Sequence, residues 1–270
     1  MKRVLARWLL RCFLPRFLTS SHDLDRVLGQ AILLQLGRTT DDQFRQQLDE
    51  YYSHVDIKAL VQDLDFPALS ARLHEIDAYK IAVVCRKGDS SADPSKNRLD
   101  LWARRFGLLR RIGVSLDTLL LRAGEQIPPH GHNRVVSGFY VLDGEVGARH
   151  YDRIREIDGG LSIRKVFDQV LMAGGYTTNS EHFHNIHWLV GRAPESYLFR
   201  ITVVGTPTRP FTRAHAASSR VYVDPTGQPD ASGVIEAVYV TEMAAKGLQY
   251  YAVLPQRANV MHEPSSPSRG

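Results

Sequence analysis

Pro128-Pro129-His130-Gly131-His132 carries two histidines separated by one residue. On an extended segment such histidines point to the same side, because the side chains of a strand repeat every two residues. Together they would form a pair of ligands for a divalent metal ion. A third ligand is expected on a neighbouring strand, and a second cluster further along the chain offers His182, His184 and His187. The alternative interpretation is a histidine-rich turn that only ends a strand.

Short runs of β-type residues lie on both sides of this stretch, and turn signals such as Asp143-Gly144 and Gly174-Gly175 separate them. Many short strands at regular spacing are typical of a sandwich or a barrel. The strands expected are residues 114–122, 135–142, 145–151, 165–172, 185–190, 197–204 and 234–240.

The chain before these runs has helical spacing of its apolar residues, from residue 21 to about residue 82. Thr40 and Gln43 have the form of a capping box, and Asp65-Phe66-Pro67 opens a further helix. The segment 88–96, rich in Ser, Asp and Pro, is expected to be a solvated loop and the main internal boundary. The sequence therefore predicts three parts: an N-terminal helical region (1–90), a β-barrel domain (97–254) and a disordered tail (255–270).

The net charge of +5 comes from the amino terminus. Five of the 34 basic side chains lie in residues 1–22, which hold no acidic residue, so the remaining ones only balance the 29 acidic side chains. A surface for nucleic acid is therefore not expected. Arg3, Arg7 and Arg11 form a narrow stripe on an amphipathic helix. Three roles stay open for residues 1–18: packing on the protein's own domain, peripheral contact with an anionic membrane, or a transit peptide.

The composition is that of an ordinary globular protein, with 43% hydrophobic and 23% charged residues. Only Cys12 and Cys85 are present, which is too few for a disulfide framework. Thiols that form no disulfide framework are typical of proteins in a reducing compartment, so a cytoplasmic location is expected.

The histidine pair, framed by glycines, resembles the first motif of the cupin family. Gly124 stands before His130 and His132, and Gly144 follows them at the family's spacing. The resemblance implies a mainly β fold, a cupin-type jelly-roll barrel with a metal at one open end, here preceded by the helical region. Many cupins carry a glutamate ligand at the position of Ser137. A hydroxyl is a poor ligand by comparison, so a site of imidazoles alone is expected.

Just under a third of the chain resembles more specifically the three-histidine thiol dioxygenases, above all the branch of plant cysteine oxidases and cysteamine dioxygenase. The matching runs are residues 124–132, 141–144, His150-Tyr151-Asp152 and Asn185-Ile186-His187-Trp188. The resemblance implies that His130, His132 and His187 bind Fe(II).

Three neutral ligands suit that chemistry, because they leave the positive charge of Fe(II) to attract a thiolate and leave positions for O2. The expected activity is that of a mononuclear non-haem Fe(II) dioxygenase, which oxidises a small thiol or a terminal cysteine to a sulfinate. No organic cofactor is needed. A 2-oxoglutarate-dependent enzyme would instead be expected to carry a His-x-Asp/Glu pair, so the His-x-His pair argues against that class of enzyme.

The residues expected around the metal depart from both branches of that family. Thr202 stands where the branch of plant cysteine oxidases and cysteamine dioxygenase has an aspartate. Compared with cysteine dioxygenases proper, Arg200, Thr202 and Val204 replace a Ser, a His and a Tyr. Such groups fix substrate and proton positions, so activity could be altered, weakened or lost. Ser137 also stands where cysteine dioxygenase has its crosslinking cysteine, so no thioether crosslink is expected.

Within the second cluster, His184 and His187 would face opposite sides of a regular strand, so only one of them fits the cavity. His187 is preferred as the metal ligand because it follows the Asn-x-His pattern. His184 would then lie at the rim of the cavity or just outside the ligands, and His182 would be exposed. The choice between His184 and His187 stays open.

Four further residues are candidates for substrate contact. Asn185 could orient a ligand or substrate, Tyr151 could hydrogen-bond a substrate, and Arg149, like Arg200, could bind a carboxylate. Each also has a purely structural alternative: a strand-edge hydrogen bond for Asn185, packing for Tyr151, and an ordinary surface position for the arginines.

Three functions remain after these arguments. The leading one is the thiol dioxygenase, with a small thiol and O2 as its partners. The second is a cupin enzyme that uses another metal or reaction. The third is a non-catalytic metal- or ligand-binding cupin whose helical region is an interaction module. The oligomeric state is left open.

Overall fold

The computed structural model describes residues 14–75, 80–82, 113–207 and 220–250. Apolar residues at helical spacing form four consecutive helices, α2 (Asp23–Gln35), α3 (Asp41–His54), α4 (Ile57–Asp63) and α5 (Phe66–Glu75). The capping box is confirmed: the Thr40 hydroxyl accepts the N–H of Gln43 at 3.2 Å, and the Gln43 side chain accepts the N–H of Thr40 at 2.9 Å. These reciprocal bonds satisfy two backbone donors and fix the start of α3.

Two antiparallel sheets make up the rest of the fold. The first contains, in order, β1 (Lys80–Ala82), β2 (Val114–Arg122), β9 (Glu195–Val204), β4 (Val135–Asp143) and β7 (Tyr176–Asn179). The second contains β10 (Arg220–Asp224), β11 (Val234–Tyr239), β6 (Gly160–Met172), β5 (Glu145–Ile157), β8 (Ile186–Gly191) and β3 (Gln126–His132). This second sheet closes into a barrel because β3 pairs with β10. A short helix, α7 (Glu242–Lys246), follows β11.

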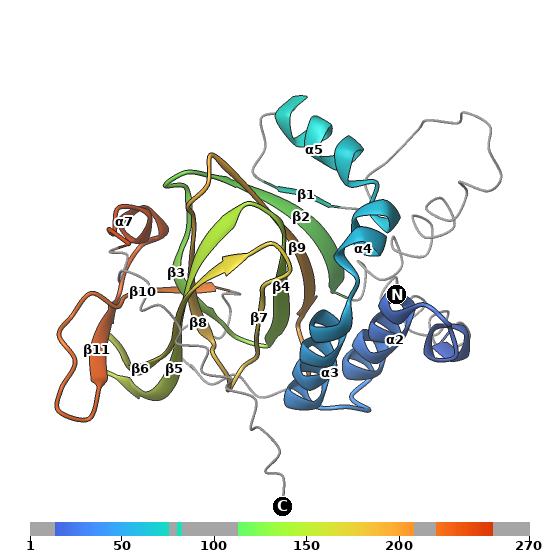
Figure 1. Cartoon of the computed structure of the whole chain (residues 1–270). Helices are drawn as coiled ribbons and strands as arrows, with labels where there is room; N and C mark the ends of the chain where they lie inside the picture. The colour runs from blue at the N-terminus through green and yellow to red at the C-terminus, as the bar shows by residue number, and fades with distance from the viewer. Residues whose placement is uncertain (1–13, 76–79, 83–112, 208–219, 251–270) are drawn as a thin grey trace, which may run out of the picture.

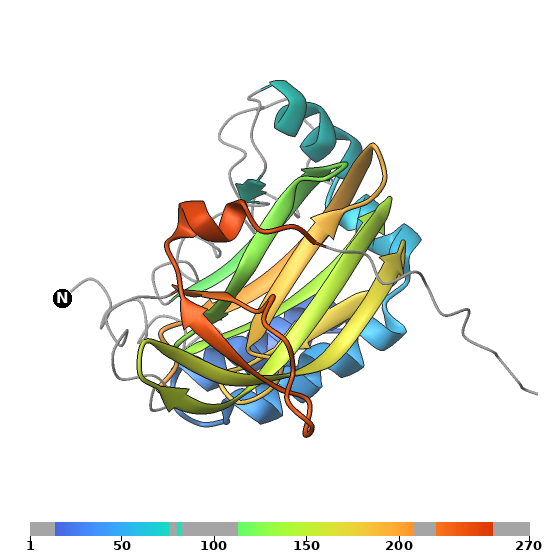
Figure 2. The ribbon, with the colours of Figure 1, turned by 90° about the vertical axis from the view of Figure 1, so that its left-hand side faces the viewer.

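The helices and the two sheets form successive layers. Helices α2, α3 and α4 cover the outer face of β9 and β4, and the barrel strands β5, β6 and β11 lie on the opposite side of the molecule (Figure 1). A view from that opposite side places β6, β11 and α7 in front of the first sheet and the helices behind it (Figure 2). The chain therefore has an interior between the sheets and a second interior within the barrel.

Alternation along the strands supplies three hydrophobic cores. On β9, Phe199 and Ile201 pack with the helices, whereas Leu198 packs between the two sheets. The third core, which includes Ile163 and Ile186, fills the inside of the barrel. Because successive side chains of one strand enter different cores, a polar residue on the inward side of a strand meets the space between the sheets.

The expected fold class, mainly β with a jelly-roll barrel and an N-terminal helical region, is confirmed. One expectation within the helical region is wrong: Lys80–Ala82 form strand β1 rather than the end of a helix. Pairing with the edge of β2 overrides the local helical spacing there. The expected loop at 88–96 and the tail from 255 lie outside the described residues.

The amphipathic terminal segment is described only from residue 14 onward. Leu14 and Phe17 are buried and belong to the core between the helices and the first sheet. The arginine stripe at residues 3–11 lies outside the described part, so the expectation of membrane contact stays a prediction. No helix within the described part is long and apolar enough to span a bilayer.

Candidate metal centre

His130 and His132 end strand β3, and His187 lies on the adjacent strand β8. Because the two histidines of β3 are two residues apart, both side chains leave the same face of the strand. His130 pairs directly with His187, after a bulge that follows Ile127 and turns the end of β3. The ring of His187 lies 5.6 Å from that of Phe139, a residue of the core between the sheets. The three histidines therefore meet between the two sheets.

One nitrogen from each histidine can be chosen so that the three atoms lie within 4.8 Å of one another. The ring centres of His130 and His187 are 4.3 Å apart, and those of His130 and His132 are 4.6 Å apart. The two Nε2 atoms of His130 and His132 are separated by 3.0 Å. The three imidazoles thus converge on one point instead of packing as separate aromatic rings.

The chain itself determines which ring nitrogens face the centre. Nδ1 of His130 lies 2.7 Å from the carbonyl oxygen of Pro128, and Nδ1 of His187 lies 3.2 Å from that of Asn185. The Asn179 amide nitrogen is also near Nδ1 of His187, at 3.4 Å, but the carbonyl is closer and assigns the proton to Nδ1. Each Nε2 then carries a lone pair available to a metal ion.

Burial keeps two of these imidazoles neutral. It lowers the pKa of His130 and His187 well below the ordinary value for histidine, and neighbouring imidazoles lower both further. A neutral imidazole is the form that binds a metal. At neutral pH the cluster is therefore ready to bind an ion without first losing protons from these two residues.

The spacing of the nitrogens fits one mononuclear ion. Two nitrogens at right angles, each about 2.1 Å from an ion, lie roughly 3.0 Å apart, whereas a tetrahedral angle would place them roughly 3.4 Å apart. The observed separation of 3.0 Å between the Nε2 atoms of His130 and His132 matches the first case. One pair of these nitrogens is therefore spaced as two ligands of one ion would be, and a nitrogen of the third histidine lies beside them.

Asn185 holds the end of β3 in place. Its Oδ1 accepts the N–H of His132 at 3.0 Å, and its Nδ2 donates to the carbonyl of His132 at 2.8 Å and to that of Ser180 at 2.8 Å. Gly131 allows this approach, since a Cβ there would lie 2.4 Å from Oδ1 of Asn185. The structure thus places Asn185 against the backbone of a candidate ligand, where it can orient that ligand.

Ser137 faces the same space as the histidines but is engaged with a neighbour. Its hydroxyl donates to Oδ1 of Asn179 at 2.9 Å. Asp117 also points inward and forms an ion pair with Arg200, with Nε 3.1 Å from Oδ2. Among the described residues, no carboxylate belongs to the histidine cluster. The ligands that the chain offers are therefore all imidazoles.

Tyr151 and Arg149 are not brought to the histidines. Arg149 pairs with Trp188 and Tyr151 with Ile186, whereas His150 pairs with His187, so alternation sends the two candidates to the other face of β5. Arg149 instead forms an ion pair with Asp168, with Nε 2.9 Å from Oδ2. The predicted contacts of Tyr151 and Arg149 with a metal-bound substrate have no support in this arrangement.

His184 lies apart from the cluster for a reason other than strand parity. Strand β8 begins at Ile186, and His184 precedes it in a left-handed conformation with φ of 49°. Its ring stacks on Phe183, with the ring centres 3.7 Å apart. The expectation of a regular strand at this residue is therefore wrong, although the structure still gathers His187 rather than His184 with the pair on β3.

His150 is a buried site residue to which the sequence analysis assigned no role. Its Nε2 lies 3.0 Å from the Thr177 hydroxyl, its Nδ1 lies 3.4 Å from the carbonyl of His184, and its ring centre is 6.0 Å from that of His187. Burial lowers its pKa well below the ordinary value. Its role could have been inferred from its position in β5, which places it on the same face as His187 once β5 and β8 are paired. That pairing depends on the tertiary fold and could not be read from the sequence.

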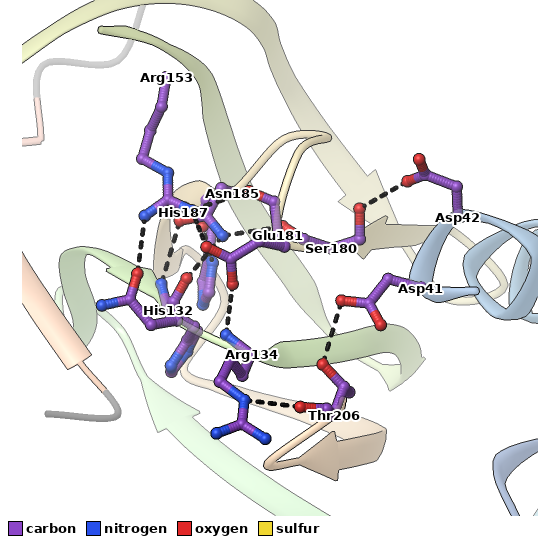
Figure 3. A network of polar contacts seen from close by, with 11 residues as sticks. Asp41, Asp42, His132, Arg134, Arg153, Ser180, Glu181, Asn185, His187 and Thr206 are labelled. Carbon is purple, nitrogen blue, oxygen red and sulfur yellow. Dashed lines mark hydrogen bonds and ion pairs between the residues drawn. The ribbon is translucent and has the colours of Figure 1, made fainter. Parts of the chain in front are cut away.

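A polar network ties the helices to the strand ends that carry the site (Figure 3). Arg153 and Glu181 form a fully buried ion pair at 2.7 Å, and Oε2 of Glu181 accepts the N–H of Arg134 just after β3. Thr206 donates to Asp41 in the first turn of α3 at 3.2 Å, and Ser180 donates to Asp42 at 3.0 Å. The turns next to His132 and before β8 are therefore anchored to α3.

Known proteins resemble this chain only weakly and in part. The chain matches no protein-family model and no curated protein. Similar solved structures include an oxalate oxidase (21% identity over 36% of this chain and 45% of that chain, TM-score 0.28) and procruciferin, the 11S globulin of Brassica napus (14% identity, 38% and 24%, TM-score 0.30). A cupin superfamily protein from Desulfitobacterium hafniense is also similar (14% identity, 34% and 68%, TM-score 0.25).

The match thus spans less than half of the oxalate oxidase chain. At these levels of similarity no substrate or activity is carried over from those proteins. Any function assigned to this chain has to rest on its own residues.

Proposed function

We propose that this chain is a mononuclear non-haem Fe(II) dioxygenase that oxidises a thiol to a sulfinate. The observation that carries the proposal is the convergence of three imidazoles, those of His130, His132 and His187, with no carboxylate among the described residues of the cluster. Neutral ligands leave the charge of the ion available to an anionic substrate such as a thiolate. In the reaction, R–SH and O2 give R–SO2H: the sulfur gains both oxygen atoms, O2 is the oxidant, and no further reductant is needed.

Fe(II) bound by these histidines would supply the centre at which O2 and the thiol react. The chain's own residues hold that centre in place. Pro128 and Asn185 orient the imidazoles of His130 and His187 through their carbonyl groups, and the Asn185 side chain fixes the backbone of His132. Such support of ligating histidines sharpens their geometry and raises metal affinity.

Arg200 and Thr202 are the residues that this proposal assigns to substrate binding. Both share the inward side of β9, and the positive charge of Arg200 acts on the pKa of His187. The Thr202 hydroxyl oxygen is buried without a hydrogen-bond partner in the described structure. A buried unsatisfied hydroxyl is costly, and a polar group of a substrate would remove that cost. Arg200, now paired with Asp117, could turn its guanidinium toward a substrate carboxylate.

The test combines metal analysis with oxygen uptake. Protein expressed without added metal should contain about one iron per chain and should consume O2 only when a thiol is present. The panel is cysteine, cysteamine, mercaptopropionate and a cysteine-initiated peptide, and the product should gain two oxygen atoms by mass. Stoichiometric zinc with no uptake on any of these thiols would contradict the proposal.

One observation favours a non-catalytic cupin as the second candidate. Arg200 and Asp117 neutralise each other inside the site, and the positions of Thr202 and Val204 carry no ionisable group that could transfer a proton. A protein that only binds a metal or a small ligand would need no such group. The zinc outcome of the same experiment would support this alternative.

A further inference from the structure

A cavity of about 650 Å³ lies on the face of β5 and β8 opposite to the three histidines. Its wall includes Arg149 and Tyr151 of β5 and Trp188 of β8. The fold separates it from the candidate metal centre by the thickness of one sheet, since neighbouring residues of these strands face opposite ways. Cavities of roughly 300–1,000 Å³ are typical of small-molecule sites, and the mouth of a β-barrel is a common place for one.

The charges around the cavity favour an anion. Arg149, Arg164 and Lys165 line it, and no acidic residue is among the described residues that do. Asp168, the cross-strand partner of Arg149, binds two of these cations, with its Oδ2 2.9 Å from Nε of Arg149 and 3.1 Å from Nζ of Lys165. Two further carboxylates lie outside the lining, where Asp230 interacts with Arg164 and Asp224 with Tyr151. The charged side chains that line the cavity itself are therefore all cations.

Aromatic groups form the apolar side of the same cavity. Trp188 is almost wholly buried, and its ring meets that of Tyr250 edge to face with ring centres 5.1 Å apart. The guanidinium carbon of Arg149 lies 4.5 Å from the ring centre of Tyr250. Burial raises the pKa of Tyr151 to about 12, so its hydroxyl remains a neutral hydrogen-bond donor. Cations, a phenol and an indole therefore line one space.

The loop from β10 to β11 forms part of the wall. Pro225, Gly227 and Pro229 of this loop line the cavity. Asp224 fixes the loop's start, because its Oδ1 accepts both the N–H of Thr226 at 2.9 Å and the hydroxyl of Thr226 at 2.6 Å. Two prolines and a side-chain-capped turn restrict the loop before any ligand arrives, which reduces the entropy lost on binding.

We propose that this cavity binds a small organic anion with a flat apolar ring, of which an aryl carboxylate is the simplest form. The ring packs against Trp188, and the carboxylate lies between Lys165, Arg164 and the Tyr151 hydroxyl. This site is distinct from the proposed iron centre and does not depend on a metal ion.

The test measures binding by isothermal titration calorimetry on the full chain after removal of metal by a chelator. The probes are 2-naphthoate, its neutral analogue 2-naphthamide, and inorganic phosphate. One equivalent of 2-naphthoate should bind, and each of the other two probes should bind at least about tenfold more weakly, because each lacks either the charge or the ring. Equal binding of naphthamide or of phosphate would overturn the proposal.

Matched charge variants locate the site. Lys165→Gln and Arg164→Gln should each weaken naphthoate binding about threefold, as expected for partly exposed ion pairs. Arg72→Gln removes one positive charge from α5 and should leave the affinity unchanged. His130→Ala should also leave it unchanged, and a loss of naphthoate binding in that variant would place the ligand at the histidines and overturn the proposal. Thermal unfolding of each variant checks that it folds.

Discussion

The three histidines differ in how the chain shields them. His130 and His187 are almost wholly buried, and Nδ1 of each lies near a backbone carbonyl, whereas His132 is partly exposed. Among the three histidines, His132 is therefore the one in contact with solvent in the described structure.

Replacing His187 by Ala should lower the iron content at least about tenfold, because two imidazoles and water hold Fe(II) far less firmly than three imidazoles. His184→Ala is the matched control, and it should keep most of the iron because that ring lies on Phe183, outside the cluster. Metal analysis after dialysis measures both. Iron kept in His187→Ala and lost in His184→Ala would show that the third ligand is misassigned.

Asn185→Ala should weaken iron binding about 10- to 100-fold, although Asn185 is not a ligand, because it fixes the backbone of His132. The free energy of unfolding should also fall by about 1–3 kcal/mol, since buried backbone groups lose their partners. Chelator competition measures the affinity, and urea unfolding measures the stability. A loss of stability with unchanged affinity would mean that Asn185 supports the fold but not the site.

At the scale of elements, α3 approaches the first sheet closely at a glycine of β4. The Tyr52 hydroxyl donates to the carbonyl of Gly138 on β4 at 3.1 Å, and a Cβ on Gly138 would lie 2.5 Å from Cε2 of Tyr52. A glycine inside a strand usually weakens it, but here it allows the helix to approach the sheet. The helical layer is therefore fitted to this sheet and not simply appended to it.

Gly138→Ala should lower the free energy of unfolding by about 1–3 kcal/mol, because the added methyl group displaces the Tyr52 ring. In a Tyr52→Leu background the same change should cost less, since the obstructing atom is gone. A double-mutant cycle in urea measures the difference. Equal costs in both backgrounds would assign the effect to the strand and not to the contact with α3.

Many of these helices and strands could be predicted from the sequence, because capping motifs and runs of β-type residues are recognisable over a few neighbouring positions. The capping box at Thr40 and the β-type runs of β2 and β9 follow from residues close in the chain. Strand β10 was missed, because Arg220–Asp224 is short and exists through its pairing with β3 and β11, which lie far away in sequence. Short strands of this kind are set by their partners.

The candidate metal site could also be predicted only in part. A spacing of two residues places His130 and His132 on one face of any strand, and the third histidine needed only a neighbouring strand. The face of β5 could not be predicted, because which side of a strand meets the space between the sheets depends on its pairing. For that reason Arg149 and Tyr151 were expected near the metal, while His150, between them in sequence, is the residue that faces it.

For the whole molecule, burial of histidines makes stability depend on pH. Burial lowers the pKa of His130, His150 and His187 in the folded protein, whereas unfolded histidine titrates near pH 6.5. Below that pH the unfolded chain binds protons that the folded chain does not, so acidification favours unfolding. This contribution to stability is complete at about pH 7.5 and is lost as the pH falls toward the folded pKa values.

The metal-free protein should therefore lose up to about 1.4 kcal/mol of stability per histidine between pH 7.5 and 5.5. Urea midpoints at the two pH values measure the loss. His150→Asn should reduce the dependence by up to a third. Stability that rises on acidification would contradict this account.

Strands β5 and β8 each present one side to the histidines and the other to the second cavity. The number of residues in each strand therefore matters as well as their types, because it sets which side chains face which site. Deletion of one residue within β5 would exchange its two sides, sending Arg149 or Tyr151 toward the imidazoles and His150 toward Trp188. A single indel would thus damage both sites together, whereas substitutions at alternate positions could redesign either site without touching the other. Laboratory evolution of this scaffold should accumulate point changes along these two strands, with insertions confined to the loops.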